Sequence, residues 1–113
     1  MDKIIEYIKK AFAYIVNLVR KVINGIINFA KNIVNWFKNL NLVQKRDVPF
    51  IANANSPEFQ AMLKNAPVKN VGIFKGVYNE ETGEITHHEF VEADGLDQET
   101  KNVLGNENLV VLQ

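Results

Sequence analysis

Few side chains in this sequence are of the kinds that bind metal ions or attack a substrate. The chain has no cysteine, which excludes disulfides, thiolate metal sites and thiol nucleophiles together. Its two histidines, His87 and His88, are adjacent, and adjacent residues of a β-strand point to opposite faces. The pair is therefore not expected to share one ion, and we expect neither a bound metal nor a cofactor.

The acidic run from Glu92 to Glu99 has the composition of a calcium-binding loop but not its spacing. An EF-hand loop needs a glycine at its sixth position and a bidentate glutamate at its twelfth, and Gly95 comes too early. We interpret the run as a solvated turn in which Asp97 caps the start of a short helix.

Nucleophilic catalysis would have to use a threonine or Ser56, the only serine in the chain. Ser56 stands directly before Pro57 and Glu58, which is the pattern of a helix N-terminus capped by serine. The sequence also lacks the nucleophile elbow, the phosphate-binding loop and the dinucleotide-binding fingerprint. We expect that the protein is not an enzyme.

Charge is divided unevenly along the chain, although 13 basic and 13 acidic residues cancel overall. Residues 1–43 carry seven basic and two acidic side chains, so residues 44–113 carry the remaining six and eleven. Such a division can hold the two parts together, align neighbouring molecules or place the basic part on an anionic surface. Without an overall positive charge, binding to phosphates would be weak, and nucleic acid is not an expected partner.

The elements that must position these residues begin with a strongly helical pattern from Asp2 to about Leu40. Residues placed at about 100° intervals form a polar arc of roughly 140° and an apolar arc of roughly 200°. The pattern predicts one long amphipathic helix, and its apolar face is too wide for a two-stranded coiled coil. We expect this face to bind a partner. The residues expected in the contact are Ile15, Leu18, Val22, Ile23, Ile26, Phe29, Ile33, Trp36 and Phe37.

A straight helix of this length would extend far beyond the rest of the chain. At about 1.5 Å per residue it would span roughly 58 Å, whereas a domain of about 70 residues has a radius of gyration of about 11 Å. Either other chains or lipid cover the excess, or the helix breaks at Gly25 and folds back as a helical hairpin. Glycine at that position costs about 1 kcal/mol relative to alanine.

The rest of the chain predicts a small α+β domain, which begins after a polar linker. A short strand at 48–52 contains Pro49, which would confine it to a sheet edge. Ser56 caps a helix of one or two turns that extends to about Asn65 and is ended by Pro67.

The second half of this domain contains a β-hairpin signal. Strands at 71–78 and 84–91 flank a five-residue connection with a glycine late in the loop. A short helix between Asp97 as cap and Gly105 as stop then precedes a buried final strand at 109–112.

Together these patterns predict an α+β protein in two parts. Residues 1–43 form an amphipathic helix for assembly or anchoring. Residues 44–113 form a small domain with a β-hairpin, one or two further strands and two short helices, and we expect this domain to fold on its own.

The expected function is that of a non-enzymatic assembly subunit that docks through its N-terminal helix onto protein partners or further copies of itself. A virion or another large particle is the kind of complex that fits a small chain without catalytic residues. The alternative is a peripheral membrane protein, in a toxin-like variant a pore former, whose helix lies in the interface of a membrane surface.

The expected location is intracellular or within a particle. No small-residue cleavage site follows the short apolar stretches near the start, so we expect no signal peptide. Nine residues separate Lys10 from Arg20, whereas a transmembrane helix needs about 20 consecutive apolar residues. We therefore expect no membrane span.

Overall fold

A five-stranded mixed sheet forms the middle of the protein in its computed structural model, which describes residues 3–15, 17–62 and 70–112. The strand order is β1-β5-β4-β3-β7, with β1 parallel to β5 and all other neighbours antiparallel. A second, two-stranded parallel sheet joins β2 to β6. The strands are β1 Arg20–Val22, β2 Ile26–Ile27, β3 Asp47–Asn53, β4 Val71–Asn79, β5 Glu84–Ala93, β6 Gly95–Leu96 and β7 Leu109–Val111.

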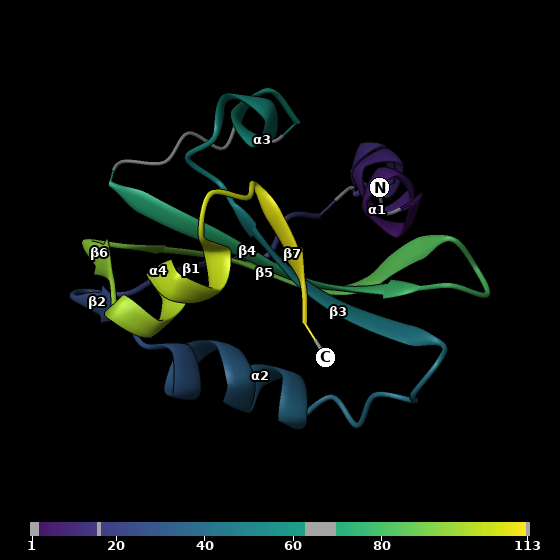
Figure 1. Cartoon of the computed structure of the whole chain (residues 1–113), viewed down its shortest axis with the longest axis horizontal. Coiled ribbons are helices and arrows are strands. Elements are labelled where there is room, and N and C mark those ends of the chain that lie inside the picture. The colour runs from purple at the N-terminus through teal and green to yellow at the C-terminus, as the bar shows by residue number, and fades with distance from the viewer. Residues whose placement is uncertain (1–2, 16, 63–69, 113) are drawn as a thin grey trace.

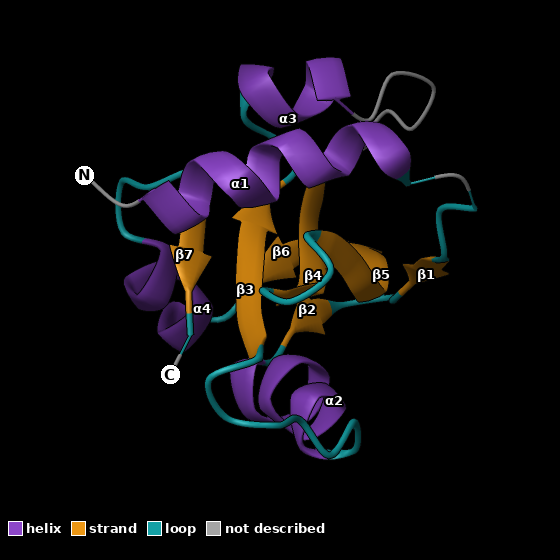
Figure 2. Ribbon diagram, turned by 90° about the vertical axis from the view of Figure 1, so that its right-hand side faces the viewer, coloured by secondary structure: helices purple, strands orange, loops and turns teal. Residues whose placement is uncertain are grey.

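Helices cover both faces of the main sheet (Figure 1). Figure 2 shows α1 and α3 on one side of the strands and α2 on the other. The helical elements are α1 Lys3–Ala11, the 3-10 turn η1 Phe12–Tyr14, the π-helical segment η2 Phe29–Val34, α2 Asn35–Lys38, α3 Pro57–Met62 and α4 Gln98–Leu104. The predicted mixed α and β class is confirmed.

Two apolar cores follow from the alternation of side chains along the central strands. Phe50 and Ala52 of β3 contribute to the core under α1 and α3, whereas Ile51 between them contributes to the core under η2 and α4. The first core is largely aromatic, and the Phe12 and Phe74 ring centroids in it are 4.7 Å apart.

The predicted continuous helix from Asp2 to Leu40 is wrong. The helix that starts the chain ends with η1 at Tyr14, and a second helical segment, η2 followed by α2, begins only at Phe29. The described residues between them, 15 and 17–28, are not helical and supply β1 and β2. Asp2, the predicted cap, lies outside the described residues.

The break has a physical cause in the residues between the two helices. Seven of the thirteen residues from Ile15 to Ile27 are valine or isoleucine, whose branched side chains fit strands better than helices. Gly25 has a φ of +130°, a backbone conformation that side-chain-bearing residues rarely adopt. The alternative of a helical hairpin folded at Gly25 is also wrong, because the first helical segment already ends at Tyr14 and Gly25 joins two short strands.

The position of Pro49 corrects a second prediction, because β3 is not an edge strand. β3 lies between β4 and β7. The carbonyl of Pro49 accepts a hydrogen bond from the Leu112 N–H at 2.8 Å, so the missing proline N–H would face β7 where that strand ends at Val111. β3 therefore tolerates Pro49 because it lies at the end of the β3–β7 pairing, not because β3 is an edge strand.

The local signals of the second half are confirmed where the structure describes them. Ser56 caps α3 by accepting from the Phe59 N–H at 3.3 Å, and Asp97 caps α4, which Gly105 ends. The predicted hairpin is formed by β4 and β5, and the predicted final strand by β7. The predicted end of the Ser56 helix, from Asn65 to Pro67, lies outside the described residues.

The expected boundary between residues 43 and 44 does not separate two cores. Ile8 and Phe12 lie in one core with Phe50 and Phe74, and Ile33 lies in the other with residues of the central strands. Of the helices that the structure describes, not one has the length and apolarity needed to cross a bilayer.

Candidate functional site

The two histidines have different partners in the structure. The His88 ring stacks on Phe74, with centroids 5.5 Å apart and planes 3° from parallel. Its Nε2 lies 3.1 Å from the Val19 N–H and 3.2 Å from the Asn17 carbonyl oxygen. His87 is exposed and hydrogen-bonds with the Thr86 hydroxyl at 3.1 Å. His88 therefore holds the segment that leads into β1 and does not face His87.

The acidic run forms a structural junction. Asp97 accepts a hydrogen bond from the Thr100 N–H at 2.9 Å within α4, and its other oxygen accepts from the Phe29 N–H at 2.9 Å at the start of η2. Burial by itself would raise the pKa of Asp97, but the hydrogen bond from the Thr100 hydroxyl, together with those from the Phe29 and Thr100 N–H groups, lowers it below its ordinary value. Over 3–15, 17–62 and 70–112, no three His, Asp or Glu side chains gather as a metal site would need.

Among the described residues, the most deeply buried charge belongs to Lys75 of β4, whose side chain is 3 % exposed. Its Nζ lies 2.6 Å from Glu89 Oε1 on β5, donates to the Asn32 carbonyl at 2.7 Å, and sits 4.7 Å from the centre of the Trp36 ring. Burial lowers the pKa of Lys75, and the hydrogen bond with Glu89 opposes that effect. With three partners around it, this amine locks η2 and α2 onto the sheet and is not available as a nucleophile.

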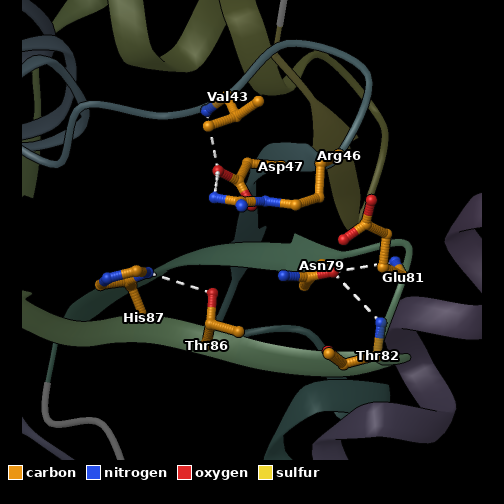
Figure 3. Close-up of polar contacts among 8 residues, drawn as sticks. All are labelled: Val43, Arg46, Asp47, Asn79, Glu81, Thr82, Thr86 and His87. Carbon is orange, nitrogen blue, oxygen red and sulfur yellow. Dashed lines mark hydrogen bonds and ion pairs between the residues drawn. The ribbon is translucent and has the colours of Figure 1, made fainter.

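A second ion pair lies where the chain enters β3 (Figure 3). Arg46 donates to both oxygens of Asp47, at 3.0 and 2.9 Å, and the Val43 N–H donates to Asp47 at 2.8 Å. The bond from Arg46 is the largest cause that holds the Asp47 pKa below its ordinary value. The neighbouring β4–β5 turn is closed by Asn79, whose side-chain oxygen accepts from two backbone N–H groups.

The structure separates the nine predicted contact residues into three groups. Ile33 is fully buried. Six are partly buried, five of them against one core or the other, and Trp36 against Phe37 and Lys75. Val22 and Ile26 remain at the surface. The six are Ile15, Leu18, Ile23, Phe29, Trp36 and Phe37.

Of the two exposed residues, Val22 lies on β1 at one edge of the main sheet, whereas Ile26 lies on β2 in the two-stranded sheet. Val22 is 70 % exposed and Ile26 is 55 % exposed, and Val19, which the sequence did not single out, is 51 % exposed. We refer to Val19 and Val22 together as the β1 edge, because β1 is the last strand on that side of the sheet.

About half of the backbone N–H and C=O groups of the β1 edge form hydrogen bonds with β5. The Val19 carbonyl accepts from the Phe90 N–H at 2.7 Å, and the Ile23 N–H donates to the Glu92 carbonyl at 2.8 Å. In a parallel ladder of this register the odd-numbered residues of β1 bond to β5, so the N–H and C=O of Val22 point away from it. An ion pair of 2.8 Å between Arg20 and Glu92 fixes β1 in place.

Comparison with known proteins adds no family to this description. No protein-family model, curated protein or solved structure matches the chain.

Sequence reasoning missed the Lys75 cluster and the edge position of Val19. Lys75 is a lone charge inside a predicted strand of apolar residues, and in the hairpin register it stands directly opposite Glu89. That cross-strand pair depends on the observed register, which includes a bulge between Val77 and Tyr78; the predicted strands at 71–78 and 84–91 would have put Lys75 opposite His87. Val19 had no local signal, because its exposure depends on the pairing of β1 with a strand about 70 residues away.

Proposed function

We propose that the protein is a non-enzymatic assembly subunit that associates with a second copy of itself through the β1 edge. The observation that carries the proposal is Val22, an apolar side chain that is 70 % exposed on a strand with an open outer side. Unpaired strand edges are templates for pairing with another chain.

The β1 edge is suited to pairing around a two-fold axis. If two β1 strands meet antiparallel with the axis at Val22, the outward N–H and C=O of one Val22 face those of its copy. In that register Lys21 stands opposite Ile23 and Arg20 opposite Asn24, so basic side chains are not directly opposed. The net charge of the chain is zero, so copies do not repel each other over long range.

The alternative of a membrane-bound helix receives less support. An interfacial helix needs a free apolar face, but Ile8 and Phe12 are buried and Ile4 and Ile5 pack against the same core. A closed dimer, by contrast, is a unit from which a larger complex, a virion or other particle among them, could be built.

The test is Val22→Asp, measured by sedimentation equilibrium over a concentration series. Two carboxylates would meet at the axis, and an unpaired carboxylate in an interface costs several kcal/mol. At about 1.4 kcal/mol per factor of ten, the dimer should weaken by at least about a hundredfold. Ile26→Asp should weaken it less, because Ile26 lies beyond β1.

Val43→Asp is the matched control. Val43 is 48 % exposed and lies on the segment before β3, which β4 and β5 separate from β1. This variant should dimerise like the wild type, and circular dichroism should show native folding for all variants. A wild-type protein that stays monomeric throughout would overturn the proposal, and flotation of that monomer with anionic vesicles would favour the membrane alternative.

A further inference from the structure

An open apolar cleft lies between the η2–α2 helix, the segment that leads into β3, and the unit formed by α4 and β7. Its volume of about 820 Å³ falls within the range of about 300 to 1,000 Å³ that is typical of small-molecule sites. The apolar walls come from all three elements and stay partly exposed. They include Phe29, Phe37, Leu42, Val43, Val103 and Leu112.

Two charged side chains line the cleft, and one of them is already neutralised. Asp47 receives three hydrogen bonds from Arg46 and the Val43 N–H, and Figure 3 shows all three residues turned toward one another. The charge of Asp47 is therefore balanced within the protein.

Lys38 is the other charged residue of the lining, and its side chain is exposed. Its ammonium group makes no ion pair or hydrogen bond with any residue in the described part of the chain. The cleft thus combines apolar walls with a single unpaired positive charge.

We propose that this cleft binds an amphipathic monoanion, namely a carboxylate that carries an unbranched apolar chain. The apolar chain would lie along Phe29, Phe37 and Val103, where its burial removes both surfaces from water. The carboxylate would pair with Lys38 in a charge-assisted hydrogen bond. A polyanion fits less well because Lys38 offers the cleft a single unpaired positive charge.

Trp36 provides a reporter for this binding. It is the only tryptophan in the chain, and its ring centroid is 4.9 Å from that of Phe37, which lines the cleft. A ligand that contacts Phe37 should change the fluorescence of Trp36.

The experiment titrates the full chain with decanoate, kept below its micelle concentration, and follows both Trp36 fluorescence and heat of binding. Saturable binding of one decanoate per chain is expected. Lys38→Gln should weaken it by about tenfold to a hundredfold, as expected for the loss of one charge-assisted hydrogen bond. Lys31→Gln is the matched control, because Lys31 is exposed on η2 but does not line the cleft, and it should bind decanoate like the wild type.

Decyltrimethylammonium, which has the same chain and the opposite charge, should bind much more weakly than decanoate. Val22→Asp should leave decanoate binding unchanged, so this inference and the proposed dimer can fail separately. The inference is overturned by non-saturable binding, by equal affinity for the two amphiphiles, or by a Lys38→Gln variant that binds as well as the Lys31→Gln control.

Discussion

At the scale of single residues, the polar contacts of His88 join parts of the chain that are about 70 residues apart in the sequence. The N–H of Val19 and the carbonyl of Asn17 both approach Nε2 of His88. One ring nitrogen can accept from the first or donate to the second, but not both at once. The neutral ring with Nε2 as acceptor is the form that anchors the chain just before β1.

This contact predicts a loss of stability in mildly acidic solution. Burial lowers the pKa of His88, and the Asn17 carbonyl opposes that shift only in part. The unfolded chain therefore binds more protons than the folded one as the pH falls below about 6.5, and the free energy of unfolding decreases in that window. The slope should stay below about 1.4 kcal/mol per pH unit, the value for one whole proton.

Urea unfolding of the wild type and of His88→Gln between about pH 7.5 and 5, the window around the ordinary histidine pKa, measures this effect. Glutamine can still form a hydrogen bond but does not titrate, so the decrease should be smaller in that variant. An equal decrease in wild type and His88→Gln would contradict the prediction. Asp47 and Asp97 have pKa values lowered from about 3.8 and lose their contribution only at more acidic pH.

At the scale of elements, the segment from Ile15 to Ile27 shows how an amphipathic helical pattern can belong to strands. A helical spacing of apolar residues records only which positions are apolar, and short strands that pack on one side satisfy it as well. The outcome here was decided by branched side chains, by pairing with β5, and by the turn at Gly25.

Gly25→Ala separates the helical prediction from the observed structure by the sign of its effect. In a helix, alanine would stabilise the protein by about 1 kcal/mol relative to glycine. At the observed φ of +130° the same change should destabilise it by about 1 to 3 kcal/mol. A Cβ at this position meets no atom within 4 Å, so the change would report backbone strain alone. Thermal or urea unfolding measures it, and a more stable variant would contradict the observed turn.

At the scale of the whole molecule, the first 40 residues close both faces of the sheet. α1 and η1 cover the aromatic core, while β2 and η2 cover the aliphatic core. Because each contributes fully or almost fully buried side chains, the remaining residues do not enclose a core on either face without them. This packing argues against the expectation that residues 44–113 fold on their own.

Deletion of residues 1–40 should therefore abolish the cooperative fold. Ile8, Phe12, Ile27 and Ile33 are at most 5 % exposed, and burying one such side chain contributes about 1.5 to 3 kcal/mol. Their combined loss approaches the 5 to 15 kcal/mol, roughly, that holds a typical domain together. An amide correlation spectrum of the truncated chain should lack dispersion, and native-like peak positions for β3, β4 and β5 would contradict the prediction.

Features that depend on neighbouring residues follow from the amino-acid pattern alone. The caps at Ser56 and Asp97, the stop at Gly105 and the hairpin of β4 and β5 each involve contacts within a few residues or across one short turn. Their energies are local, so a pattern of residue types is enough to predict them.

Contacts between distant segments determine that the chain between η1 and η2 supplies strands and not a helix. They also determine where the candidate site lies. Whether Val22 lies in a helix or a strand depends on the free side of β5, whose partner residue Glu92 is far along the chain. Likewise, β3 tolerates Pro49 because β7 ends beside it. Lys38 lines a cleft only because three separate elements are arranged around it. Local preference for helix or strand amounts to less than about 1 kcal/mol per residue, so pairing and burial between distant segments outweigh it.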